Sequence, residues 1–329
     1  MLKLVKIENA SNLNISDWKN YFKKNEQATI AHSFSVGLIL QKTYGYSFEP
    51  YKVLKDNKVV GFVPFCRIGE KLVSMPHFSY GGVLDGVIDS KEDAVNLFKQ
   101  LDCKKFEVRG FNVCSPYFSD EKISCFLKLE STSEEQMAAF KSKLRSQIKK
   151  GVKNGLLCNV GGKELLNDFY DVYSRNMHDL GSPVLTKLFF QNLIDDYKDG
   201  MVNIQLVYHN EKAIGASFLI SYFDFMEVCW ASTLRKYNYL QPNMVLYWEM
   251  ISYAIKNEMN IFSFGRSTKS TGTHKFKKQW GCEDVQLYFN FSEKPKGDIK
   301  KAVFLMKLWK NIPYKLAMFF GPFITKRIY

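Results

Sequence analysis

The chain has 329 residues and a formal net charge of +13, from 46 Lys and Arg against 33 Asp and Glu. Apolar residues make up 46% and aromatic residues 15%, which excludes a disordered chain and is enough for two packed domains. The seven cysteines form no CxxC pair, so neither a disulfide framework nor a zinc motif is predicted.

The positive charge is concentrated in two segments. Residues 140–154 carry six Lys and Arg and no acid, and residues 294–329 carry nine against one acid. Charge of one sign in a short segment points to anionic partners. No apolar run reaches the length of about 18 to 20 residues that spans a membrane, and the first residues lack a signal-peptide core. We therefore expect a cytoplasmic protein.

The first half of the chain predicts an α/β unit. Alternating apolar residues give a hairpin at residues 51–61, with Asp56 and Asn57 in the turn because Asn tolerates positive φ. The elements expected after it are a strand at 62–65, a helix at 91–101 and a strand at 105–109.

The junction near residues 131–155 predicts one basic helix that starts at Ser133. Its apolar stripe consists of Met137, Phe140, Leu144 and Ile148. Arg145 and Lys149 lie four residues apart on one face, where they can reach an anionic ligand held between two domains. The alternative is a linker helix with a solvated basic face.

The second half repeats the order of the first. A hairpin at residues 203–215, with His209 and Asn210 in the turn, precedes a strand at 216–220. A helix at 243–257, opened by Pro242, and a strand at 261–264 follow. Two units of the same order indicate a duplicated fold.

The stretch after the last of these strands is strongly basic. From Gly265 to Trp280 it holds five Lys and Arg, no acid, and many Ser, Thr and Gly. A strand that ends in such a loop can hold an anion through backbone N–H groups, hydroxyls and cations. A solvated basic loop is the alternative.

The C-terminal segment, residues 299–329, predicts an amphipathic helix that ends before Pro313, followed by an apolar stretch. One side of that helix consists of Ile299, Ala302, Val303, Leu305, Met306 and Trp309, and the other carries Lys300, Lys301 and Lys307. This pattern suits an anionic membrane surface and equally suits a terminal helix that packs on its own domain.

Few patterns point to specific chemistry. The five histidines lie far apart, so no metal site is expected, and GxSxG, Walker and GxGxxG motifs are missing. No recognition-helix motif indicates DNA. A site that binds and positions its substrates remains.

Five strings together carry a family resemblance. They are SMPHFSYGG, KLRSQIKKGVKNGL, RNMHDLGSP, YNYLQPNMVLYWE and FSFGRSTKSTGTHKFKKQWG. In order and spacing they resemble FemAB-related proteins, the peptidoglycan-bridge aminoacyltransferases, and most of all the FemAB-like proteins of exopolysaccharide and envelope loci. The resemblance extends from Asn25 to the basic tail.

The resemblance implies an α/β fold of two tandem GNAT-like domains, with mixed sheets flanked by helices. The expected divisions are a first domain at 1–130, a connecting helix at 131–155, a second domain at 156–293 and a basic amphipathic tail at 294–329. The implied activity is transfer of an acyl or aminoacyl group to an amine of a lipid-linked or nucleotide-linked envelope precursor. A non-catalytic scaffold of a polysaccharide assembly system is the alternative.

The resemblance also implies the site. Lys277 is the candidate for stabilising the oxyanion, and His178 is the candidate base because histidine is the residue type whose ordinary pKa lies nearest neutral pH. The residues implied to bind donor or acceptor are Tyr80, Gly82, Asn243, Arg266, Ser267, Thr271, Gly272 and Lys278.

The acyl donor stays undecided. We expect no tightly bound cofactor, and the co-substrate is either aminoacyl-tRNA, as in Fem enzymes, or acyl-CoA, as in GNAT enzymes. The stretch from Gly155 to Met201 is too short for the helical arm that Fem proteins commonly carry. Arg235 fits the first position of the GNAT pyrophosphate loop, but Asn238 and Leu240 stand where glycines are needed. The expected location is the cytoplasm, with a peripheral position on the inner face of the cytoplasmic membrane as the alternative.

Overall fold

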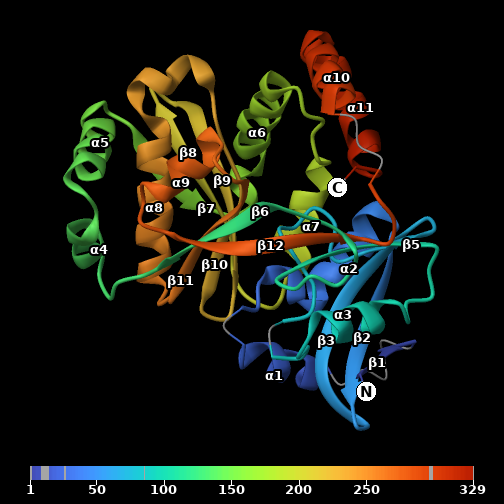
Figure 1. The fold of residues 1–329 in the computed structure, drawn as a ribbon. Helices are drawn as coiled ribbons and strands as arrows, with labels where there is room; N and C mark the ends of the chain where they lie inside the picture. Colours follow the sequence, from blue (N-terminus) through green and yellow to red (C-terminus); the bar gives the residue numbers. More distant parts are fainter. Residues whose placement is uncertain (1, 9–14, 26, 85, 296–298, 329) are drawn as a thin grey trace. The chain divides into compact units, whose positions relative to one another are not determined.

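The computed structural model describes residues 2–8, 15–25, 27–84, 86–295 and 299–328, and the side chains of 299–302 lie outside the described part. The chain forms two compact units, each made of separated segments (Figure 1). Unit 1 contains residues 1–125, 265–275 and 283–296, and unit 2 contains the remainder. Among the described residues, no helix is long and apolar enough to cross a membrane.

Unit 1 is built on strands in the order β1-β2-β3-β4-β5-β12-β6. Their bounds are β1 Leu2–Lys6, β2 Ser47–Lys55, β3 Lys58–Ile68, β4 Lys71–Val73, β5 Lys105–Gly110, β12 Glu283–Phe291 and β6 Tyr117–Lys128, of which the last three residues of β6 belong to unit 2. β1, β2, β3 and β4 pair antiparallel in sequence, and β4 pairs parallel with β5. β12 comes from the far end of the chain and pairs antiparallel with β5.

Helices and a short 3-10 turn of the first segment accompany these strands in unit 1. They are α1 Ile15–Lys23, η2 Ile30–His32, α2 Phe34–Tyr44 and α3 Lys91–Phe98. The hydroxyl of Ser90 caps α3 by accepting from the backbone N–H of Asp93, which explains where that helix begins. The apolar face of α3 packs against β1, and its Leu97 and Phe98 belong to the buried core.

Unit 2 carries strands in the order β11-β10-β9-β8-β7. Their bounds are β7 Leu157–Gly161, β8 Val202–His209, β9 Lys212–Tyr222, β10 Phe225–Thr233 and β11 Ile261–Thr268, of which the last four residues of β11 belong to unit 1. β7 to β10 pair antiparallel with their neighbours, and β10 pairs parallel with β11.

The helices of unit 2 follow the same chain order. They are α4 Ser133–Ala139, α5 Ser142–Lys153, η3 Lys163–Leu165, α6 Leu166–Leu180, α7 Lys187–Asp196, η4 Arg235–Leu240, α8 Pro242–Lys256, α9 Gly272–Lys278, which unit 1 shares, α10 Ile299–Asn311 and α11 Tyr314–Thr325. α6 and α8 both pack against β8, β9 and β10 and lie on either side of these strands in Figure 1. A cluster of buried aromatic rings, which includes Phe169, Phe190 and Phe218, fills the α6 side.

The structure corrects the predicted basic helix at the junction, which is two helices. Phe140 is extended, with ψ 148, and separates α4 from α5. The guanidinium of Arg145 donates to the carbonyls of Ala138 and Phe140, so it takes up backbone acceptors at the end of α4. Phe140 thereby turns inward against Trp280. Phe140, Leu144 and Ile148 of the predicted stripe are buried, so only the prediction of one continuous helix is wrong.

Two other expectations also change. The second hairpin turn is Asn210-Glu211, one residue later than predicted, because His209 still pairs with Lys212. The basic stretch predicted as a loop contains the end of β11, as far as Thr268, and then helix α9.

Candidate functional site

The strands β10 and β11 part within unit 2. They pair in parallel over Phe225–Glu227 and Ile261–Ser263. The registered pairing stops there although both strands, which are described in full, continue. β10 also has a register shift against β9 between Val228 and Trp230, so its pleat is interrupted just past the last pair. Strands that separate in this way can admit an extended ligand between them.

Glu227 and Ser263 occupy the last paired position before the strands part. Both are buried, with 3% and 0% of their surfaces exposed. The hydroxyl of Ser263 donates to Oε2 of Glu227 at 3.2 Å. A buried carboxylate needs such donors to offset its lost hydration, so the pair fixes the two strands to each other at this point.

Lys277 in α9 is buried, with 4% of its surface exposed. Its neighbours Phe276 and Trp280 contact the ring of Tyr247 in α8, at centroid distances of 5.0 and 6.0 Å. Tyr247 in turn stacks on Phe264 of β11. The aromatic rings therefore hold the end of α9 against the same strand that parts from β10. Burying an ammonium group costs free energy unless it is paired, so Lys277 is a candidate for a functional role.

Hydrogen bonds between residues close in sequence hold the turn that follows Lys277. The Lys277 carbonyl accepts from the backbone N–H of Trp280 at 3.0 Å and from the thiol of Cys282 at 3.3 Å. Gly281 has φ 85, which glycine adopts readily. Lys278 is exposed, and its Nζ donates to the Cys282 carbonyl at 2.7 Å. Lys278 therefore closes this turn in the structure.

His178 lies in a different part of unit 2. Its Nε2 is 2.8 Å from the carbonyl oxygen of Ile312, so the neutral ring carries its hydrogen on Nε2. It borders a hollow of about 470 Å³. The other lining residues are Asp171, Arg175, Asp179, Lys212, Leu234, Arg235, Lys236 and Tyr314. His178 thus shares a hollow with Arg235, and α9 contributes nothing to its lining.

The connection between β10 and α8 is a helical turn with a buried side chain. Residues 235–240 form η4, and the side chain of Leu240 is buried. The carbonyl of Leu240 accepts from the side-chain amide of Asn154 at 3.0 Å. Asn243 is the second residue of α8, after Pro242, and is half-buried. The turn is therefore helical, where a glycine-rich loop would leave open N–H groups.

The basic face of α5 forms a second hollow, of about 430 Å³. Its lining is Ser142, Arg145, Ser146, Lys149, Lys150 and Lys153. Arg145 and Lys149 lie on one face as predicted. The guanidinium of Arg145, however, donates a hydrogen bond to the Phe140 carbonyl at the end of α4. Every residue of this lining except Arg145 is exposed, Lys149 included.

In unit 1, Arg266 meets the segment of residues 74–82. Its Nη1 lies 3.3 Å from the carbonyl oxygen of Phe78, which Arg109 also contacts, through its own Nη1, at 3.4 Å. Both guanidinium groups lie over the ring of Phe289, at 5.6 and 5.0 Å. Arg109 is ion-paired with Glu107. Two of the predicted stretches are therefore in contact at Phe78.

The surroundings of Arg266 are electropositive. Burial lowers the pKa of Lys122, and the charge of Arg266 lowers it further. Burial, Arg109 and Arg266 together lower the pKa of His77 to about 3. Cations that lower the pKa of neighbouring basic groups create a positive field, which favours the approach of an anion. This group in unit 1, Arg109, Lys122 and Arg266, is called the cation cluster below.

Tyr80 and Gly82 have structural roles in unit 1. Tyr80 is fully buried, and its hydroxyl donates to the carbonyl of Gln27 at 3.3 Å. A Cβ on Gly82 would lie 2.9 Å from the carbonyl oxygen of Arg109, so the backbones approach too closely for a side chain. The carbonyl of Gly82 also accepts from Nε2 of His32 at 3.1 Å.

Ser267, Thr271 and Gly272 lie around the end of β11 and the start of α9. Ser267 is 6% exposed, and among the described residues its hydroxyl finds no hydrogen-bond partner. Thr271 donates to the Thr268 carbonyl at 2.8 Å and accepts from the backbone N–H of His274 at 3.4 Å. A Cβ on Gly272 would meet open space. Ser267 therefore keeps an unused buried hydroxyl, and Thr271 begins α9.

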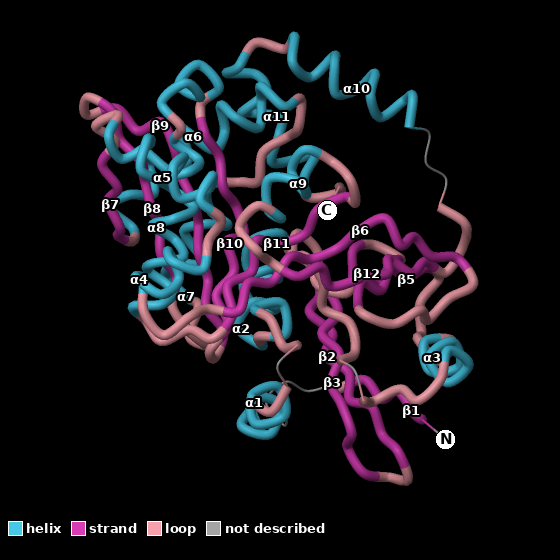
Figure 2. Tube along the Cα trace, turned by 60° about the vertical axis from the view of Figure 1, so that its left-hand side comes forward, coloured by secondary structure: helices cyan, strands magenta, loops and turns pink. Residues whose placement is uncertain are grey.

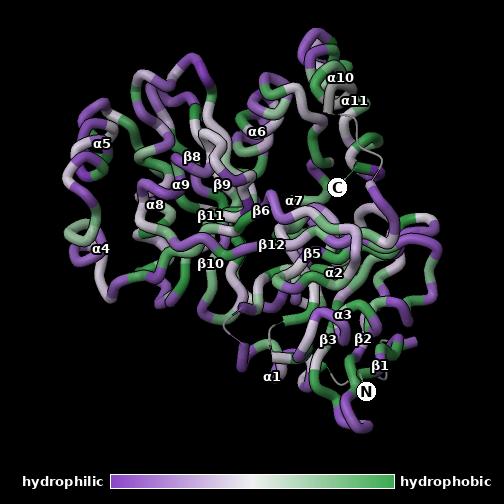
Figure 3. The backbone as a smooth tube through the Cα atoms, in the orientation of Figure 1, coloured by the Kyte–Doolittle hydropathy of each residue, from purple (hydrophilic) through white to green (hydrophobic). Residues whose placement is uncertain are grey.

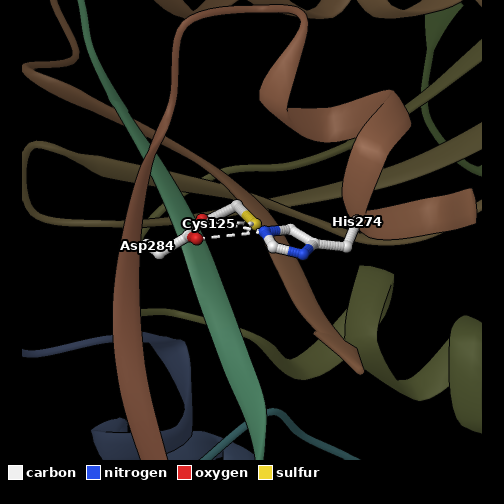
Figure 4. Close-up of side chains that lie close together, drawn as sticks. All are labelled: Cys125, His274 and Asp284. Atoms are coloured by element: carbon white, nitrogen blue, oxygen red, sulfur yellow. Dashed lines mark hydrogen bonds and ion pairs between the residues drawn. The ribbon is translucent and has the colours of Figure 1, made fainter. Parts of the chain in front are cut away.

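Cys125, His274 and Asp284 gather in unit 1 (Figure 4), which the sequence pattern does not predict. Nε2 of His274 is 3.0 Å from Oδ2 of Asp284, and Nδ1 accepts from the backbone N–H of Ser270 at 3.0 Å. Because Nδ1 accepts, the neutral ring carries its hydrogen on Nε2, toward Asp284. A metal on Nε2 would need that hydrogen on Nδ1. The arrangement therefore fits a pair that ties α9 to β12, and we assign no metal to it.

Residues 138–278, from the end of α4 through α9, match the model of the acetyltransferase (GNAT) domain. The chain has a tandem GNAT fold. A solved tandem GNAT protein from the clavulanic acid biosynthesis pathway superposes with a TM-score of 0.53 at 10% identity, over 91% of this chain and all of that one. The fold class predicted from sequence is thereby confirmed.

Two other solved structures share the tandem GNAT fold. FemX superposes with a TM-score of 0.66 at 12% identity, over 86% of this chain and 96% of FemX. L-PGS from Bacillus licheniformis superposes with a TM-score of 0.52 at 10% identity, over 90% of this chain and 97% of that one. The resemblance to FemAB-related proteins therefore holds for the fold. No curated protein sequence matches the chain significantly.

Sequence reasoning missed Arg109, Lys122 and Glu227. Each lies in an ordinary strand pattern with no family string around it. Arg109 and Lys122 become neighbours of Arg266 through the pairing of strands far apart in the chain. Of these three residues, Glu227 could have been found from the sequence. It is an acid inside an otherwise apolar strand, Phe225-Met226-Glu227-Val228.

Proposed function

We propose that the protein is an acyltransferase that moves an acyl or aminoacyl group to an amine of an anionic cell-envelope precursor. The observation that carries the proposal is the parting of β10 and β11 beside α9, inside the segment that matches the GNAT domain. Lys277 is buried next to one of these strands, where a cation can act on a carbonyl group that is undergoing attack.

In the proposed reaction the neutral amine of the acceptor attacks the donor's carbonyl carbon. A C–N bond forms, and the carbonyl oxygen becomes an oxyanion. The ammonium of Lys277 stabilises that charge because it lies in a site of low water content. The intermediate then expels the thiolate of CoA or the ribose oxygen of tRNA, and the proton lost by the amine goes to this leaving group or to solvent.

Either donor carries phosphates that need cations. The hollow beside η4 offers Lys212, Arg235 and Lys236 against Asp171 and Asp179. We assign it to donor phosphates because it lies at the end of β10, the strand that parts from β11. The filled η4 turn favours contact through side chains over a backbone cradle. Acyl-CoA and aminoacyl-tRNA both remain candidate donors, and both are cytoplasmic.

The acceptor is proposed from the fold and from charge. FemX and L-PGS share the fold, and the resemblance to FemAB-related proteins implies a lipid-linked or nucleotide-linked muropeptide or an amino sugar. The cation cluster of unit 1, with the unused hydroxyl of Ser267, supplies groups that suit an anionic acceptor. Arg266 and Ser267 are the members of the predicted site that we assign to it.

The second candidate function is a non-catalytic scaffold at a polysaccharide assembly system. The observation that favours it is the buried Leu240 in η4, at a position where GNAT cofactor loops need a glycine. A scaffold would bind the precursor through the cation cluster and transfer nothing.

One experiment separates the two functions. The purified protein is incubated with radiolabelled acyl-CoA or charged tRNA and a membrane extract, and label in the envelope fraction is counted. An acyltransferase moves label, and Lys277→Ala removes most of the signal while Lys256→Ala, at an exposed position of α8, does not. Binding of the precursor without transfer from any donor would support the scaffold.

A further inference from the structure

The two C-terminal helices are attached to unit 2 along one side. Small residues of α11 face Val184: a Cβ on Gly321 would lie 2.9 Å from its Cγ2, and the hydroxyl of Thr325 donates to its carbonyl at 3.1 Å. Ala317, one turn before Gly321, is fully buried. The hydroxyl of Tyr314 lies 2.7 Å from that of Ser174. α11 is therefore docked through Ala317, Gly321 and Thr325, spaced four residues apart.

The opposite side of α11 is apolar and exposed. Its four large residues are Leu316, Phe319, Phe320 and Phe323, with 49%, 63%, 49% and 65% of their surfaces exposed. The ring of Phe319 lies 5.1 Å from that of Phe320 and 5.8 Å from that of Phe323, so the rings form one patch. Figure 3 shows that apolar residues run through both tail helices. Three phenylalanines of this docked helix are exposed to solvent. The packing of α11 on unit 2 therefore leaves an apolar patch unburied, and such patches mark interaction sites.

The tail that carries this patch is basic. Lys315, Lys326 and Arg327 are exposed beside it, and α10, a separate helix in Figure 2, adds exposed Lys307 and Lys310. From residue 299 to 329 the sequence has seven Lys and Arg and no Asp or Glu. An apolar face next to basic residues matches the region between the headgroups and acyl chains of an anionic bilayer.

We propose that the exposed face of α11 lies in the surface of an anionic lipid bilayer. The phenylalanine rings enter the acyl region, and the flanking Lys and Arg contact lipid phosphates. The docked face holds α11 to unit 2, so insertion brings unit 2 to the membrane without spanning it. The sequence left two alternatives for this segment, and the structure separates them by side: one side packs on the protein and the other is available to lipid.

The test is co-sedimentation of the full-length protein with vesicles of phosphatidylcholine alone or with about 30 mol% phosphatidylglycerol. The wild type is expected to bind the anionic vesicles and to release from them in high salt. Phe319→Ser with Phe323→Ser should lower the bound fraction about tenfold, and Lys315→Glu with Lys326→Glu should lower it on anionic vesicles alone. Leu188→Ser, at an exposed residue of α7, is the matched control and should bind as the wild type does.

Three results would overturn the proposal. One is a wild type that binds neither kind of vesicle. The second is a Phe319→Ser, Phe323→Ser variant that binds anionic vesicles as well as the wild type does and has the same thermal stability. The third is a wild-type dimer in sedimentation velocity that Phe319→Ser with Phe323→Ser converts to a monomer, which would assign the face to a second copy of the chain. None of these readouts measures acyl transfer, so the proposed function is tested separately.

Discussion

Ser263 donates its hydroxyl to the carboxylate of Glu227 at 3.2 Å, at the last position where β10 and β11 are paired. Beyond this contact the strands separate, and the proposed site begins. The hydrogen bond is buried, so its loss removes one donor from a buried carboxyl group. The hydrogen bond between Ser263 and Glu227 therefore contributes to the stability of unit 2 and also fixes the point where β10 and β11 separate.

Ser263→Ala is expected to lower the free energy of unfolding by about 1–3 kcal/mol, because the Glu227 carboxylate loses a buried donor. Urea unfolding followed by circular dichroism measures this. Ser252→Ala in α8, whose buried hydroxyl has no partner among the described residues, is the control and should change stability less. Equal losses in the two variants would mean that the Glu227 contact contributes nothing.

Gly82→Ala and Gly272→Ala should differ, although both glycines are predicted site residues. At Gly82 the added Cβ meets a backbone carbonyl at 2.9 Å, so we expect a loss of about 1–3 kcal/mol in unfolding free energy. At Gly272 it meets open space, and stability should be unchanged. Thermal melts of the two variants decide this. A Gly272→Ala protein that melts normally but has lost activity would support a binding role for that position.

His32 predicts a pH dependence of unit 1. Burial lowers its pKa to about 4, from an ordinary value of 6.5. The unfolded chain therefore binds a proton below pH 6.5 that the folded chain refuses until pH 4, and stability falls as the pH falls through this window. From pH 6.5 to pH 5 the loss from this one group should be about 2 kcal/mol.

The control for that prediction is His32→Gln, which does not titrate. It lowers stability at every pH, because the ring's contacts with Thr29 and Gly82 change. The difference between wild type and variant should shrink by about 2 kcal/mol from pH 6.5 to pH 5. Trp18 fluorescence follows unit 1, since its indole donates to the His32 carbonyl at 2.7 Å. A difference that stays constant with pH would contradict the assignment.

His178→Gln and His178→Ala separate an anchoring role from a catalytic one. Because Nε2 of His178 contacts the Ile312 carbonyl, a Gln amide can replace the donor and Ala cannot. We expect Gln to retain most activity, and Ala to speed proteolysis after the tail loosens. If His178 is the base, both variants lose about 10²–10⁴ in rate, and the acidic limb of the pH–rate profile disappears.

Local patterns predicted much of the fold. Pro242 marked the first residue of α8, and the hairpin at Asp56-Asn57 formed at the predicted residues, because each depends on neighbours in sequence. The cation cluster and the pair of His274 with Asp284 could not be predicted. They require β12, from the end of the chain, to lie between β5 and β6, and only long-range pairing specifies that order.

The rate of acyl transfer by Lys277→Ala tests the central claim most directly. It is measured on the donor and acceptor identified by the labelling experiment, with Lys256→Ala beside it. The account predicts a rate about 10²–10³ lower than wild type for Lys277→Ala, with an unchanged melting curve, and a normal rate for Lys256→Ala. A folded Lys277→Ala protein that turns over at the wild-type rate would contradict the account.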